Sequence, residues 1–255
     1  KGFVPAVASR GVVQVSAYVD TAYASLVSER AVSALTYSQT IALLPVSLFG
    51  MAVAAAELPE MSADAVKSHE ARALAIRERI DAGQRRMAFF VVPSMFAFLA
   101  LGDVIAQVLL QSGRFTAAES RYCWYILMGS GLALLAQTSG RLLSSALFAL
   151  GDTRTPMRIA MIRVGVGMAL GYVAVRWLPQ ALGVPADLAV VFITLTTGFT
   201  AWLENQLLRR ALARELGSSV PSLLSALPKL MAAAVVAATV TLGAKVALVS
   251  QFGAD

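Results

Sequence analysis

The sequence predicts an all-α membrane protein, built as a bundle of about seven transmembrane helices. Hydrophobic residues make up 58% of the chain and charged residues only 14%, with a mean hydropathy of +0.70. These values lie outside the range of soluble domains. Several apolar stretches reach about 20 residues, the length that a helix needs to cross a bilayer core. The apolar residues show no alternation of period two, which excludes an outer-membrane β-barrel.

Polar segments divide the chain into seven expected spans. They lie at about residues 3–28, 31–57, 86–112, 121–150, 157–178, 186–209 and 223–250. Between the second and third spans, the charged stretch at about 62–85 predicts an amphipathic segment on the cytoplasmic side. The other connections are short.

Basic residues indicate the orientation, because cytoplasmic loops hold an excess of Lys and Arg. They gather before the first span, in the 62–85 segment, around the turn after residue 150, and between residues 209 and 229. The first span is therefore expected to begin in the cytoplasm. The motif "GDTRTP" then forms a cytoplasmic turn, in which Gly151 ends one helix, Asp152 or Thr153 caps the next, and Pro156 lies in its first turn. Arg154, Arg158 and Arg163 are counted with this cytoplasmic side.

Several classes of function are excluded by what the sequence lacks. The chain has one cysteine, Cys123, and one histidine, His69, so neither a disulfide framework nor a Cys or His metal cluster is expected. The formal net charge of +6 is explained by cytoplasmic loops and does not indicate nucleic acid. We find no pattern of nucleophile with base and no phosphate loop, so we do not expect an enzyme.

Ionisable residues inside spans are candidate functional groups, because an unpaired charge is costly there. Asp20 in "SAYVDTAYAS" could form a cation or proton site, or could lie solvated near the outer interface. Arg141 in "TSGRLLSS" could meet an anionic lipid head group, or could extend its side chain to the cytoplasmic surface. Glu204 is expected as an ordinary carboxylate near the inner interface.

Two further patterns concern the walls of the bundle. The first half of the second span is polar, with Ser33, Gln39 and Thr40 among its side chains, and this favours a hydrophilic cavity over helix contacts alone. Gly167 and Gly171 are spaced as in GxxxG pairs and predict a close helix contact.

Three segments, in this order, carry a resemblance to a known family: "VDTAYASLVSERAVSALTYSQTIALLPVSLFGMAVAAAELPEMS", "SGRFTAAES" and "ALFALGDTRTPMRIA". Together they resemble the second half of the MurJ (MviN) family, the lipid II flippases of bacterial peptidoglycan synthesis within the multidrug/oligosaccharidyl-lipid/polysaccharide exporter superfamily. The resemblance covers roughly residues 1–215.

The resemblance implies an architecture and a mode of action. Residues 1–215 would form the C-terminal six-helix lobe of an alternating-access transporter, and residues 216–255 an additional transmembrane helix from an incomplete C-terminal pair. The lobe would work with the N-terminal lobe of the same protein in the bacterial cytoplasmic membrane. Lipid II would pass from the inner to the outer leaflet for cell wall biogenesis, without bond chemistry and in contact with membrane lipids.

The resemblance also implies a weak cation site. Asp20, Thr197 and the carbonyl of Ile193 match positions that contribute to a sodium site in some family members, so sodium is the candidate coupling ion and no other cofactor is expected. Gly167 and Gly171 stand where the family has Asn and Asp. The implied sodium site is therefore incomplete in this chain.

The implied substrate contacts are altered as well. Ser38, Gln39 and Thr40 replace the usual Ala-Asp-Arg of the second span, whereas Ser33 and Arg141 match a frequent serine and an often basic position. Arg141, Ser33, Gln39 and Thr40 are the candidate substrate-binding residues. The changes leave two alternatives open: a flippase for another polyprenyl-linked saccharide, or a non-transporting structural or regulatory homologue of the cell envelope.

Overall fold

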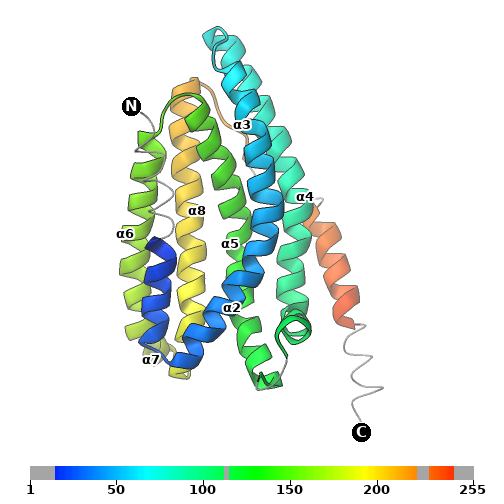
Figure 1. The fold of residues 1–255 in the computed structure, drawn as a ribbon, viewed down its shortest axis with the longest axis vertical. Coiled ribbons are helices and arrows are strands. Elements are labelled where there is room, and N and C mark those ends of the chain that lie inside the picture. Colours follow the sequence, from blue (N-terminus) through cyan, green and yellow to red (C-terminus); the bar gives the residue numbers. More distant parts are fainter. Residues whose placement is uncertain (1–14, 112–114, 223–229, 244–255) are drawn as a thin grey trace.

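A computed structural model describes residues 15–111, 115–222 and 230–243, and this part of the chain is helical without a β-strand. The all-α expectation is therefore confirmed (Figure 1). Residues 15–25 form the first described helix. The elements that follow are α2 (Glu29–Pro45), η1 (Val46–Met51), α3 (Ala52–Asp64), α4 (His69–Leu110), α5 (Ala117–Ala149), α6 (Arg154–Arg176), α7 (Leu178–Leu182), η2 (Ala186–Leu188) and α8 (Ala189–Leu216). A shorter apolar helix spans Leu230–Gly243.

The expected second span is one long rod that changes its helix type in the middle. Pro45 ends α2, and the following six residues, Val46–Met51, form a π-helix before α3 continues to Asp64. Proline has no N–H group to donate to the preceding turn, so the hydrogen-bond ladder is interrupted there. A π segment is a common way to continue a helix past such an interruption.

The charged segment at 62–85 is amphipathic in its helical part, as predicted, but it does not form a helix of its own. Residues 69–85 are helical, but they belong to α4, which runs unbroken from His69 to Leu110 and also contains the third expected span. One side of this segment is buried, including Ile76, Ile80 and Gln84. The amide of Gln84 donates to the hydroxyl of Ser139 on α5 (3.3 Å). The segment is therefore the first part of α4 and forms a helical hairpin with α3. Its buried apolar side fixes it against the neighbouring helices.

Ion pairs hold this hairpin together. The guanidinium of Arg79 on α4 lies 2.5 Å from Asp64, 2.9 Å from Glu60 and 3.5 Å from Glu57, all on α3. Arg86 adds a second contact to Glu57 at 3.2 Å. Glu57 and Asp64 are buried, so these pairs neutralise carboxylates that would otherwise be unpaired away from water.

Helix α5 occupies the centre of the bundle, with α2, α3, α4 and α8 packed around it (Figure 1). Four helical stretches are long and apolar enough to cross a membrane by length and composition: Glu29–Asp64, His69–Leu110, Arg154–Arg176 and Ala186–Leu216. They correspond to four of the seven expected spans. The 33-residue α5 corresponds to a further expected span, the fourth in order, at 121–150. Its polar and small side chains fit a helix that faces other helices. The first and last expected spans lie partly outside the described residues.

The α3–α4 turn, the α5–α6 turn and the end of α8 lie at the same end of the bundle (Figure 1). The distribution of basic residues assigns this end to the cytoplasm. Between α5 and α6, Gly151 has a left-handed φ of 83°, and its N–H donates to Phe148 while that of Asp152 donates to Leu147. The side chain of Asp152 accepts from the N–H groups of Arg154 and Thr155 (3.1 and 3.0 Å). Both predicted caps of the "GDTRTP" turn are thus present, with Asp152 as the capping residue.

Gly50 allows the π segment to approach α5 closely. A Cβ atom at Gly50 would lie 2.7 Å from Cγ2 of Thr138, whose side chain is buried and cannot easily move. We expect Gly50→Ala to lower the free energy of unfolding by about 1–3 kcal/mol, because it overpacks this contact. Thermal unfolding of the purified protein in detergent measures the change.

Gly165→Ala on α6 is the matched control, because no atom of the described chain lies within 4 Å of the added Cβ. It removes a helical glycine without a clash and should be neutral or stabilising by up to about 1 kcal/mol. Equal losses for the two variants would show that the close contact at Gly50 has no special role.

Candidate functional site

The residues of the implied cation site meet in the structure. Asp20 lies on the helix at 15–25, while Thr197 and Ile193 lie one turn apart on α8. The hydroxyl of Thr197 is 3.0 Å from Oδ2 of Asp20 and 3.0 Å from the carbonyl oxygen of Ile193. The three predicted groups therefore form one cluster, in which the single hydroxyl proton of Thr197 faces two acceptors.

Helix α6 faces this cluster with glycines. A Cβ atom at Gly171 would lie 2.7 Å from the ring of Tyr23, and the hydroxyl of Tyr23 donates to the carbonyl of Met168 (2.7 Å). The expected close contact at Gly171 is thus confirmed, and its partner is the helix of Asp20. A Cβ atom at Gly167 would lie 3.9 Å from Cγ2 of Thr200 on α8. Neither position supplies an oxygen-bearing side chain to Asp20.

A buried ion pair near this cluster was not predicted. Arg163 of α6 donates to Glu204 of α8 at 2.7 Å, and the two side chains are only 10% and 13% exposed. The sequence pattern assigned Arg163 to the cytoplasmic turn and Glu204 to the interface. In the structure, Arg163 lies within α6 and Glu204 within α8, and each neutralises the other. Opposite charges within two neighbouring expected spans were the available signal, since such residues usually pair.

The polar stretch of α2 divides between two faces. Ser33, Thr36, Tyr37 and Thr40 are exposed and follow helical spacing, so they lie along one side of the helix. Ser38 points to the opposite side, where it is buried and donates to the carbonyl of Cys123 on α5 (3.2 Å). Gln39 is half-buried between them. We call the exposed side, with Ser33, Thr36, Tyr37 and Thr40, the hydroxyl face of α2.

Arg141 lies at a different depth from this face. The contacts Ser38–Cys123 and Gly50–Thr138 show that the α2–η1 rod runs parallel to α5. Arg141 follows Thr138 by one turn, whereas Thr40 precedes Gly50 by almost three turns. At a rise of about 1.5 Å per residue, Arg141 and Thr40 are roughly 20 Å apart along the bundle. The structure therefore places the candidate substrate-binding residues in two groups: half-buried Arg141 toward the cytoplasmic end, and Ser33, Gln39 and Thr40 toward the other.

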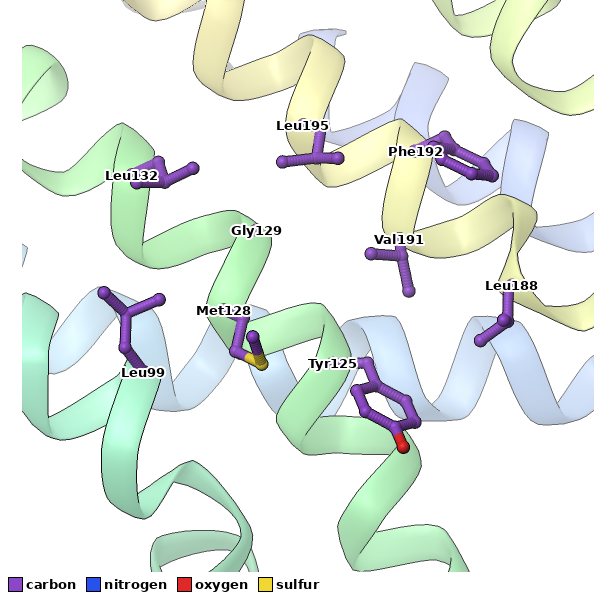
Figure 2. Close-up of a pocket in the computed structure, with 9 residues that line it drawn as sticks. All are labelled: Leu99, Tyr125, Met128, Gly129, Leu132, Leu188, Val191, Phe192 and Leu195. Carbon is purple, nitrogen blue, oxygen red and sulfur yellow. The ribbon is translucent and has the colours of Figure 1, made fainter. Parts of the chain in front are cut away.

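An apolar pocket of about 380 Å³ opens between α5 and α8, beside one residue of α4 (Figure 2). Its lining consists of Leu99, Tyr125, Met128, Gly129, Leu132, Leu188, Val191, Phe192 and Leu195. It contains no charged side chain and none of the predicted site residues. A pocket of this chemistry can accept a hydrocarbon chain, but it offers no cation for a diphosphate.

The fold and its long apolar helices define a polytopic helical membrane protein with polar groups between the helices. The model of the family described as "Lipid II flippase MurJ" matches residues 1–254. The chain belongs to the lipid II flippase MurJ family, and it is a multi-pass protein of the bacterial cytoplasmic membrane.

Individual relatives agree with this assignment. The chain is 26% identical over 209 residues to a probable lipid II flippase MurJ of Vibrio cholerae, and 31% identical over 242 residues to one of Rhizobium meliloti. These alignments cover 82% and 92% of this chain, but only 37% and 41% of the relatives. The chain thus spans well under half the length of these relatives. A solved structure titled "Lipid II flippase MurJ, inward closed conformation" matches with a TM-score of 0.74 at 20% identity, covering 91% of this chain and 45% of that one, and it supports the fold.

The hydroxyl of Thr197 can be tested as a partner of Asp20. We expect Thr197→Val, which keeps the shape and removes the hydroxyl, to lower the free energy of unfolding by about 0.5–2 kcal/mol, because Asp20 loses a hydrogen-bond donor. Thermal unfolding in detergent measures the effect.

Thr196→Val provides the control. Thr196 is also half-buried on α8, but its hydroxyl donates only to the backbone carbonyl of Ile193 (2.8 Å). This change should therefore cost less. If Thr196→Val is as destabilising as Thr197→Val, the contact with Asp20 has no particular weight.

Proposed function

We propose that residues 1–215 are the C-terminal lobe of a flippase for lipid II, and that residues 216–255 contribute an additional transmembrane helix beside it. Because the chain covers only part of its relatives, the activity belongs to the whole protein, in which the N-terminal lobe would complete the transport path. The two lobes would alternate between access from the inner and from the outer leaflet. Such a cycle moves its cargo without making or breaking bonds, so the protein is not proposed to be an enzyme or to bind nucleic acid.

The observation that carries this proposal beyond family membership is the hydroxyl face of α2. A span surrounded only by lipid gains nothing from a row of exposed hydroxyl groups, because hydrocarbon offers them no partner. Thr36 and Thr40 donate back to their own helix, to Val32 (2.8 Å) and Thr36 (2.9 Å), which leaves their oxygen lone pairs available to a polar surface. A water-filled cavity between two lobes supplies such a surface, and a sugar-bearing head group can accept or donate there.

The separation of Arg141 from the hydroxyl face suggests the order of contacts. Arg141 is the cation near the cytoplasmic end and can make charge-assisted hydrogen bonds to a diphosphate. The hydroxyl face, almost four turns of helix further out, offers only neutral contacts. A substrate would therefore be held more strongly where it enters from the inner leaflet than where it leaves. Membrane lipids would contact the remaining apolar surface, including the pocket between α5 and α8.

A flippase for another polyprenyl-linked saccharide is the second candidate. It is favoured by Thr40, which is exposed on the hydroxyl face at the position where the resemblance implies an arginine. A less charged wall would suit a head group with a different distribution of anions. A non-transporting homologue is the remaining alternative.

Depletion of the full-length protein distinguishes these candidates. We expect lipid II to accumulate in the inner leaflet and to lose its accessibility to a membrane-impermeant reagent on the outer face. Unchanged accessibility of lipid II would contradict the proposed substrate. A simultaneous loss of another polyprenyl-linked saccharide at the surface would then support the second candidate, and no change in any such lipid would support the non-transporting one.

Arg141 provides the residue-level test. We expect Arg141→Ala in the full-length protein to reduce lipid II export by roughly 10- to 100-fold, since a charge-assisted contact contributes about 1.5–3 kcal/mol. The measurement is the amount of lipid II that a membrane-impermeant reagent labels on the outer face of complemented cells, at equal protein levels. Arg121→Ala, on the same helix but exposed near its first turn, should leave export close to that of the unmodified protein. Equal export by both variants would remove Arg141 from the transport path.

A further inference from the structure

The surroundings of Asp20 are fixed by the register of three helices. Gly167 of α6 lies against Thr200 of α8. Arg163 precedes Gly167 by one turn of α6, Glu204 follows Thr200 by one turn of α8, and these two side chains form an ion pair. Tyr23 contacts Gly171 and Met168, so the helix at 15–25 lies along the same seam. Asp20, one turn before Tyr23 and bonded to Thr197, thus lies between the levels of Gly167 and Gly171, with Arg163 about one to two helical turns away.

The side chains at this position do not fit a sodium ion. Hard cations require several oxygen ligands. Among the described residues the cluster offers the carboxylate of Asp20, the hydroxyl of Thr197 and the carbonyl of Ile193, and the last two already share a hydrogen bond. Gly167 and Gly171 add no side-chain oxygen, and the Tyr23 ring fills the space beside Gly171. The donor set is too small for the ion that the family resemblance implies.

Arg163 supplies a positive charge that cannot diffuse away. Its residue is 8% exposed, and its guanidinium is held at 2.7 Å by Glu204. The Nε–H group is buried and has no hydrogen-bond partner within the described part of the chain, so the salt bridge to Glu204 does not use all of its donors. The ion pair of Arg163 with Glu204 is neutral by itself. The carboxylate of Asp20 adds a second negative charge to this group of side chains. Arg163 is therefore in contact with one carboxylate, that of Glu204, and the carboxylate of Asp20 is the second negative charge nearby.

We infer that Arg163 is the permanent counter-cation of Asp20: tethered to α6 and oriented by Glu204, it provides the positive charge that a sodium ion would provide, so this lobe binds no sodium at Asp20. The inference concerns ion dependence, and it holds for any lipid-linked cargo. Arg163 is a positioning residue in this role, because it acts through Asp20 and not on the cargo.

The first measurement uses the unmodified full-length protein, purified in detergent. A ligand that binds only the folded state raises the unfolding temperature. We expect the same midpoint in sodium chloride and in choline chloride of equal ionic strength. A midpoint that rises with sodium to saturation, and no longer does so in Asp20→Asn, would overturn the inference. This readout needs no transport, so its failure is distinct from failure of the proposed function.

The second measurement tests whether Arg163 and Asp20 are coupled. We expect Arg163→Met, which removes the charge and keeps the length, to lower the midpoint by about 3 °C or more. The double variant with Asp20→Asn should lose less than the two single variants added together, because Asp20 is then no longer left as a second unpaired carboxylate. Glu204 loses its partner with and without the Asp20 change, so that loss cancels in the cycle. Additive losses would overturn the inference.

Two variants complete this design. Arg158→Met, at an exposed position of α6, should leave the midpoint unchanged and controls for the loss of a basic residue from this helix. If Arg163→Met does not fold, Arg163→Gln, which also removes the positive charge but keeps hydrogen-bonding groups for Glu204, replaces it in the same cycle. Non-additive losses for Arg163→Gln combined with Asp20→Asn support the counter-cation, and additive losses again contradict it.

Discussion

Helix α5 can pass through the centre of the bundle only because its neighbours approach it at small residues. Gly50 of η1 lies against Thr138, Gly83 of α4 against Leu142, and Gly129 of α5 itself against Thr194 of α8. In a bilayer the hydrophobic effect does not drive helices together, so association depends on such close packing and on interhelical hydrogen bonds. The positions of α2, α4 and α8 follow from their contacts with α5, and so does the depth of every polar group they carry.

The same constraint explains where the polar groups of this lobe lie. A charge or an amide in hydrocarbon needs a partner, and neighbouring helices provide it. Gln84 meets Ser139 between α4 and α5, Asn205 donates to the carbonyl of Ala136 between α8 and α5 (3.4 Å), and Arg163 meets Glu204 between α6 and α8. These contacts tie each outer helix to a specific register. The hydroxyl face of α2 has no such helix partner in the described chain, which is why it is the natural wall of a cavity.

Charges outside the expected spans serve a different purpose. The α3–α4 hairpin extends beyond the other helices at the basic end of the bundle (Figure 1), and Arg79 joins it to three carboxylates. The "GDTRTP" turn is fixed by the side chain of Asp152. Burial alone would raise the pKa of this carboxyl, but hydrogen bonds from Thr155 and Arg154 and the nearby Arg158 outweigh it and lower the pKa. Asp152 therefore stays ionised as a helix cap at the cytoplasmic surface.

The sequence by itself determined the helical class, most of the expected spans and the capping of the 151–156 turn, because length, hydropathy and cap residues are local properties of the chain. Through the family resemblance it also brought Asp20, Thr197 and Ile193 together. Only the tertiary structure showed that α4 is continuous, that Arg141 and Thr40 lie at different depths, and that Arg163 pairs with Glu204. These features depend on how helices rotate and slide against each other. The two partners of that ion pair are 41 residues apart on antiparallel helices, and no local pattern fixes their register.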